Sequence, residues 1–79
     1  MNYAVIFSYS FDCEVAVYLF KTEEEAVQFL RDNYETELRI DNEENEWNSI
    51  GTISDDGWSA EIITSFGDRT CFQIGTIYN

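Results

Sequence analysis

Apolar and polar residues alternate along most of this 79-residue chain, and one stretch changes to helical spacing. Alternation predicts half-buried β-strands, because successive side chains of a strand point to opposite faces of the sheet. The alternating or short apolar segments are 2–9, 13–20, 49–54, 58–66 and 70–78. Tight turns are predicted between neighbouring strands where Ser, Asp and Gly gather, at 10–12, 55–57 and 67–69.

Segment 2–9 is largely apolar on both faces, which is typical of a central strand covered on both sides. Tyr3 and Tyr9 in this segment, together with Tyr18 in the next, are predicted to lie on the sheet face opposite the helix. An aromatic face of this kind would serve a homodimer or another partner.

The helix is predicted to open at Thr22. The sequence Thr-Glu-Glu-Glu allows the Thr22 hydroxyl to accept a backbone N–H while the side chain of Glu25 reaches back. Apolar residues then recur at steps of three and four, which predicts one buried stripe. The stripe consists of Ala26, Val27, Leu30, Tyr34 and Leu38.

The helix is predicted to end between Leu38 and Ile40, because a longer helix would bring Asp41 and Glu44 onto the apolar stripe. The chain length suits one domain, residues 1–79. The predicted fold is therefore α+β with the order ββαβββ, an antiparallel sheet with one helix packed on one face.

The net charge of −12, from 16 acidic and 4 basic residues, changes the functional picture. A chain so poor in Lys and Arg cannot neutralise a row of phosphates, which argues against direct binding to nucleic acid and to anionic membranes. A basic protein surface is the partner that this charge favours, since opposite charges speed association. Solubility alone is the competing explanation of the charge.

The densest acidic stretch is RIDNEENEWNS, residues 39–49, which follows the predicted helix. Trp47 stands among polar residues there and either folds over the edge of the core, which we favour, or is an exposed anchor. Trp58 is predicted to pack in the core. The residues predicted to bind a partner are Glu35, Asp41, Glu43, Glu44, Glu46 and Trp47.

The same acidic stretch, 41–49, is also a candidate divalent-metal loop. Alignment with an EF-hand places Glu46 where the tight turn requires glycine, and Thr52 where a bidentate Glu should close the site. The chain has no histidine, so Ser-His and Cys-His catalytic pairs are excluded. The prediction is a protein that is not an enzyme and has no cofactor.

Cys13 and Cys71 each lie in an apolar, strand-like stretch, where free cysteine behaves as a small hydrophobic residue. The pattern after Met1 is that of a strand and lacks a basic region followed by an apolar one. No apolar run approaches the ~20 residues that span a bilayer. These features favour a cytoplasmic protein.

The block YAVIFSYSFD…VYLFKTEEEAVQFLRDNY, residues 3–34, and DRT…IGTIY near the end resemble small acidic proteins of bacterial mobile elements and phages. In size and charge the chain is similar to anti-CRISPR and anti-restriction inhibitors. The resemblance implies a context, namely inhibition of host defence nucleases, in some cases by mimicry of DNA. It assigns no functional residue.

The leading interpretation is an acidic protein-binding domain that inhibits a nucleic-acid-handling enzyme as a DNA mimic does. Two alternatives stay open: a divalent-metal-binding module that uses the acidic loop, and a homodimeric structural domain without a charged partner.

Overall fold

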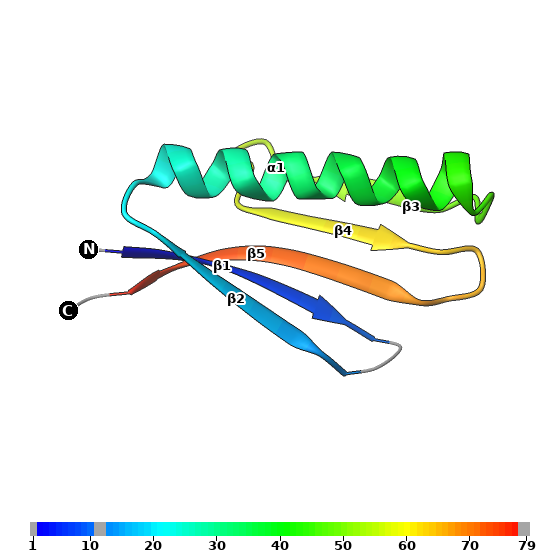
Figure 1. Cartoon of the computed structure of the whole chain (residues 1–79), viewed down its shortest axis with the longest axis horizontal. Coiled ribbons are helices and arrows are strands. Elements are labelled where there is room, and N and C mark those ends of the chain that lie inside the picture. The colour runs from blue at the N-terminus through cyan, green and yellow to red at the C-terminus, as the bar shows by residue number, and fades with distance from the viewer. Residues whose placement is uncertain (1, 11–12, 78–79) are drawn as a thin grey trace.

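The computed structural model describes residues 2–10 and 13–77, in which five antiparallel strands form one sheet beside a single α-helix. The helix packs along one face of the sheet (Figure 1), so the predicted α+β fold and the order ββαβββ are confirmed. The elements are β1 (Asn2–Tyr9), β2 (Val15–Phe20), α1 (Glu23–Arg39), β3 (Ile50–Ile53), β4 (Ser59–Ile63) and β5 (Arg69–Ile77).

The strands lie in the order β2-β1-β5-β4-β3. The first and last strands are therefore neighbours, with Tyr3 opposite Thr76 and Tyr9 opposite Thr70. β5 occupies the centre of the sheet between β1 and β4. The loops at one end of this sheet and the end of α1 frame the candidate site.

The hydrophobic core lies between α1 and the sheet face that it covers. Leu30 of the helix is fully buried, as are Val5, Ile62 and Phe72 of the strands. Aromatic rings fill much of the space, as expected from a small chain with many aromatic residues. The ring of Phe7, for example, lies 4.8 Å from that of Phe72 in an edge-to-face arrangement.

Thr22 caps the helix as predicted. Its extended backbone lies just before α1, and its Oγ1 accepts the N–H of Glu25 at 3.2 Å. The hydroxyl in turn donates to the Glu25 carboxylate at 2.9 Å, so Glu25 reaches back to the threonine side chain. Glu23, Glu24 and Glu25 fill the first turn, where the positive end of the helix dipole favours acids.

The prediction of an aromatic face opposite the helix is wrong. Tyr18 lies opposite Val5 in the β1–β2 register, and its ring is 4.9 Å from that of Phe29 on the helix. Tyr3 and Tyr9 also pack against the core cluster. Because both faces of β1 are apolar, alternation alone did not distinguish the face that the helix covers.

The opposite face of the sheet carries no covering element within the described residues, which corrects the expectation that β1 is covered on both sides (Figure 1). Val15, Val17 and Leu19 of the edge strand β2 lie on this open face and are 63, 55 and 62% exposed. The fold thus leaves an apolar strip at one edge of the sheet.

The connection between β1 and β2 also differs from the prediction. β2 begins at Val15, and Cys13 is exposed in the preceding connection with a φ of 59°. Cys71 is half-buried on β5. Phe11 and Asp12 of the predicted turn, and Tyr78 of the last predicted strand, lie outside the described residues.

Trp58 is half-buried and packs against the core, with its ring edge-to-face with Tyr3 at 6.1 Å. The preceding turn is held by Asp56, whose carboxylate accepts the hydroxyl of Ser54 and the N–H of Trp58. These bonds favour the ionised form and lower the pKa of Asp56 below its usual value.

No helix in the described part of the chain is long and apolar enough to cross a bilayer.

Candidate functional site

A second kind of helical turn follows α1 directly. α1 finishes at Arg39, as predicted, but the chain continues through a wider π-helical turn, Ile40–Glu44. The N–H of Asn45 donates to the carbonyl of Ile40 at 3.1 Å, a five-residue step. A π turn changes the angular position of the residues that follow, and such turns are frequent at functional sites.

Asp41 is the predicted partner-binding residue that the structure places differently. It is only 8% exposed, and its Oδ2 accepts the hydroxyl of Ser49 at 3.0 Å. The sequence pattern predicts that the helix ends before Asp41, so that this residue does not face the apolar side. That prediction is wrong, because the chain stays helical through Asp41 and the hydroxyl of Ser49 donates a hydrogen bond to the buried carboxylate. Asp41 therefore cannot be part of an exposed acidic surface.

The segment after the π turn is an ordered connection. The side-chain amide of Asn42 forms two hydrogen bonds with the backbone of Ser49. Its Oδ1 accepts the N–H of Ser49 at 2.6 Å, and its Nδ2 donates to the carbonyl of Ser49 at 3.0 Å. Glu46 has a φ of 56°, the left-handed conformation that often terminates helices. The acidic stretch is therefore held in place by its own polar side chains.

The backbone N–H and the backbone carbonyl of Trp47 each form a hydrogen bond. Its N–H donates to the carbonyl of Asp41 at 2.9 Å, and its carbonyl accepts the hydroxyl of Ser65 at 2.7 Å. The side chain is 39% exposed and meets Phe66 edge-to-face, with ring centroids 5.4 Å apart. Trp47 lies outside the buried core cluster, so the favoured interpretation as a core cap is wrong.

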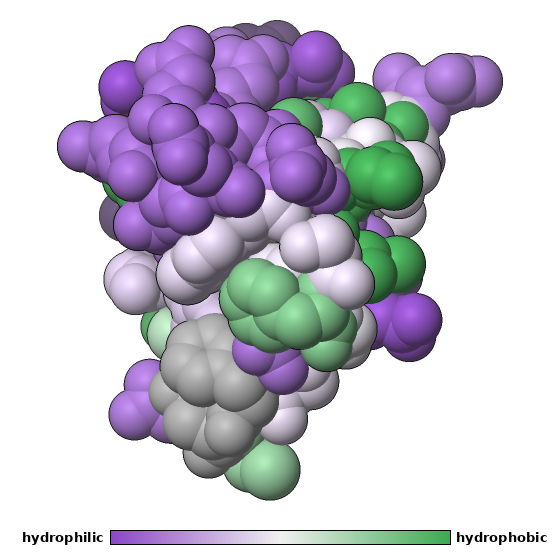
Figure 2. Space-filling view, turned by 90° about the vertical axis from the view of Figure 1, so that its right-hand side faces the viewer, coloured by the Kyte–Doolittle hydropathy of each residue, from purple (hydrophilic) through white to green (hydrophobic). Residues whose placement is uncertain are grey.

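The other predicted site residues are exposed: Glu35 on α1, Glu43 and Glu44 in the π turn, and Glu46 in the connection. Viewed toward the end of the helix, hydrophilic side chains gather over the helical layer, and the hydrophobic ones lie mainly at the right of the view (Figure 2). The structure thus leaves the four predicted glutamates and Trp47 exposed, whereas Asp41 is buried.

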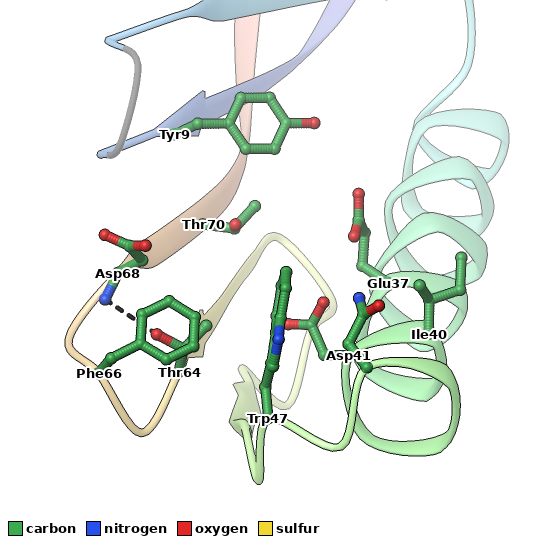
Figure 3. Close-up of a pocket in the computed structure, with 10 residues that line it drawn as sticks. Tyr9, Glu37, Ile40, Asp41, Trp47, Thr64, Phe66, Asp68 and Thr70 are labelled. Atoms are coloured by element: carbon green, nitrogen blue, oxygen red, sulfur yellow. Dashed lines mark hydrogen bonds between the residues drawn. The ribbon is translucent and has the colours of Figure 1, made fainter.

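A pocket of about 410 Å³ opens beside Trp47, between the end of the helix and the loops of the sheet (Figure 3). α1 and the π turn contribute its first wall, the 45–47 connection its second, and β1 with the β4–β5 hairpin its third. The lining residues are Tyr9, Glu37, Ile40, Asp41, Asn45, Trp47, Thr64, Phe66, Asp68 and Thr70.

Negative charge is concentrated in this pocket, which has three carboxylates and no Lys or Arg among its described lining residues. Burial, followed by the charge of Asp41, raises the pKa of Glu37 above its usual value. Both effects disfavour the ionised form, so a cation entering the pocket would relieve them. The hairpin wall is held by Thr64, whose Oγ1 accepts the N–H of Asp68 at 3.0 Å.

Metal binding is a separate question from charge. Within residues 2–10 and 13–77, no three side chains of His, Cys, Asp or Glu converge in a manner that could hold a metal ion. Glu43, Glu44 and Glu46 of the candidate metal loop are exposed.

Sequence reasoning missed the pocket and most of its residues. In the sequence, nothing distinguishes Glu37 from the other acidic residues of the helix. Tyr9, Phe66 and Asp68 lie in segments that are far from the acidic stretch in the sequence. The close pairing of β1 with β5, which brings Tyr9 beside the β4–β5 hairpin, is a long-range contact without a local signal. The one available sequence signal was Trp47 beside the acids.

Comparison of the chain with protein-family models, with curated proteins and with solved structures finds no match.

Proposed function

We propose that this protein is a non-enzymatic binding domain that engages a basic protein surface through the acids at the end of its helix. The observation that carries the proposal is the exposure of Glu35, Glu43, Glu44 and Glu46 on the helix, the π turn and the connection that leads to the exposed Trp47. Tryptophan is one of the residue types enriched in the hot spots of protein interfaces, where binding buries it.

The partner that best suits this surface is a nucleic-acid-handling enzyme of the cytoplasm. Channels that hold DNA or RNA are lined with Lys and Arg, and a net charge of −12 would draw such a surface to the chain. α1 has 17 residues, so the helix presents carboxylates over ~25 Å. A rigid row of this length is comparable to one turn of duplex DNA, which supports inhibition by mimicry.

The experiment is affinity capture from a nuclease-treated bacterial lysate with the tagged protein, at low and at high salt. Reversal of Glu43 and Glu44 to Lys is expected to abolish capture of a nucleic-acid-binding enzyme, because both the contact and the steering field change sign. Added duplex DNA should compete with the wild-type protein for the captured enzyme.

The control is the reversal of Glu23 and Glu24, which changes the net charge equally at the other end of α1. This variant should lose less of the captured enzyme than the Glu43/Glu44 variant, because Glu23 and Glu24 lie at the far end of the row of carboxylates from Trp47. Equal loss in both variants would reduce the proposal to net charge alone, and unchanged capture by the Glu43/Glu44 variant would contradict it.

Self-association is a second candidate function, and the open sheet face favours it. β2 carries no charged residue between Val15 and Phe20, lies at the edge of the sheet and exposes three apolar side chains. Two copies of a chain with a net charge of −12 repel one another, so an uncharged edge strand is the place where they can meet. Antiparallel pairing of two β2 strands would be self-complementary about a two-fold axis.

Sedimentation velocity tests this candidate. If the β2 edge is an interface, the wild-type chain sediments as a dimer and Val17→Lys is expected to be monomeric, because a buried ammonium would lack a partner. Thr52→Lys adds the same charge on the same open face at the other edge strand, β3, and should remain a dimer. A wild-type monomer at all concentrations would dismiss the candidate.

A further inference from the structure

The pocket at the end of α1 has an aromatic side and an acidic side. One side is aromatic, with Trp47 and Phe66 perpendicular to one another at an interplanar angle of 84°. The other side is acidic, with Glu37 and Asp41 from consecutive helical turns. In Figure 3 the indole of Trp47 is seen between the ring of Phe66 and the two carboxylates.

The electrostatics of the pocket select a cation. Trp47 offers the ring type that attracts cations best, and the pocket lies at the carboxyl end of α1, the negative end of the helix dipole. Arg39, the basic residue of the last helical turn, is exposed and does not line the pocket. Burial of Glu37 has already removed part of its hydration, which strengthens its attraction for an opposite charge.

The chemistry of the walls, an aromatic ring facing carboxylates, favours a planar cation. A guanidinium group is flat, stacks on aromatic rings and carries a fork of N–H donors that matches carboxylates. It is also more weakly hydrated than an ammonium group, so its entry into a partly buried pocket loses less solvation. Stacked on the indole, it would direct its donors toward the acidic wall.

We infer that this pocket binds a guanidinium group, the arginine side chain of a basic partner, between Trp47 and the carboxylates of Glu37 and Asp41. The inference rests on the proposed function for the origin of the arginine. It adds to that function a defined receptor, because the exposed acids steer the partner and the pocket holds one side chain of it.

The pocket is preorganised for this role. Both backbone groups of Trp47 are hydrogen-bonded, and Ser49 holds one oxygen of Asp41. The site therefore loses little conformational freedom on binding, which favours affinity from a small contact area.

The test is an NMR titration of the labelled full chain with acetyl-Gly-Arg-Gly-amide, at constant ionic strength. The indole N–H of Trp47 and the backbone amides of Thr64, Phe66 and Asp68 are expected to shift and saturate together. In a control peptide, citrulline replaces arginine and has nearly the same side-chain shape without the positive charge. This peptide should not shift the same NMR signals.

Two variants test the walls of the pocket. Trp47→Ala and Glu37→Gln are each expected to weaken binding of the arginine peptide about ten-fold, from the loss of a cation–π contact and of a charged hydrogen bond. Glu24→Gln removes the same charge from an exposed position at the other end of the same helix and should not alter the affinity. If Trp47→Ala does not fold, Phe66→Ala tests the aromatic wall, since Phe66 is exposed and outside the core cluster.

Three results would overturn the inference. Equal shifts with the citrulline peptide would mean that charge is not recognised. Unsaturated shifts spread over Glu23, Glu24 and Glu25 would indicate diffuse attraction to the acidic helix. Saturation by free L-arginine without binding of the peptide would assign the pocket to a small metabolite and not to a partner's side chain.

The peptide titration is independent of the capture experiment. Glu43 and Glu44 do not line the pocket, so their reversal should leave peptide binding nearly intact even where capture of the partner is lost. Failure of the pocket and failure of the proposed function therefore give different results.

Discussion

Phe72→Ala is expected to lower the free energy of unfolding by about 3–5 kcal/mol, the range for large aromatic truncations in cores. Phe72 lies on the central strand β5, is 1% exposed, and its ring meets those of Phe7 and Tyr34. A domain of this size has a total stability of roughly 4–12 kcal/mol, from per-residue averages. The substitution should therefore leave the fold marginal or lost at 37 °C.

Urea denaturation followed by tryptophan fluorescence gives the measurement. Phe66→Ala is the matched control, because it removes the same side chain at a position that is 58% exposed. Its effect should stay below about 1 kcal/mol, as for most surface substitutions. Comparable losses in the two variants would mean that the core is not centred on β5.

Gly51→Ala is expected to destabilise the fold by about 1–3 kcal/mol through overpacking. Gly51 lies on β3 beneath the helix, where an added Cβ would be 2.5 Å from the Tyr34 hydroxyl oxygen and 2.9 Å from Cδ2 of Leu38. Tyr34 is buried and so has little space to withdraw. Burial, and then the charge of Glu35, raises the pKa of its phenol, so it stays neutral and in place at neutral pH.

Gly75→Ala is the matched control on β5, since an added Cβ there meets no atom within 4 Å. Its effect should be neutral, or stabilising by up to ~1 kcal/mol through the lower entropy of the unfolded chain. The double variant Gly51→Ala with Tyr34→Phe should recover part of the loss, because it removes the nearest atom. Equal unfolding midpoints of the two single alanine variants would contradict the close approach of β3 to the helix.

The order of elements was predictable because its signals are local. Thr22 and Glu25 mark the start of the helix, and the Asp-Asp-Gly turn at 55–57 separates two strands, with glycine at a φ of 75° where other residues are strained. Each signal depends on residues within one turn of the chain, so no knowledge of the tertiary structure was needed.

The candidate site was only partly predictable for the opposite reason. The exposure of Glu43, Glu44 and Glu46 follows from their charge, whereas the burial of Asp41 depends on a π turn and on a hydrogen bond from Ser49. The position of Tyr9 depends on the pairing of β1 with β5. Strand order is decided by contacts between distant segments, and alternation within a strand carries no information on its neighbour.

The central position of β5 has a consequence for how the chain reaches its folded state. β1 is synthesised first and β5 last, yet they are neighbours in the sheet, with Asn2 opposite Ile77 (Figure 1). The sheet cannot be completed before β5 forms, because β5 joins β1 to β4. Until then β1 and β4 each have an unpaired edge, and the pairing of β1 with β5 closes a long loop, which slows folding.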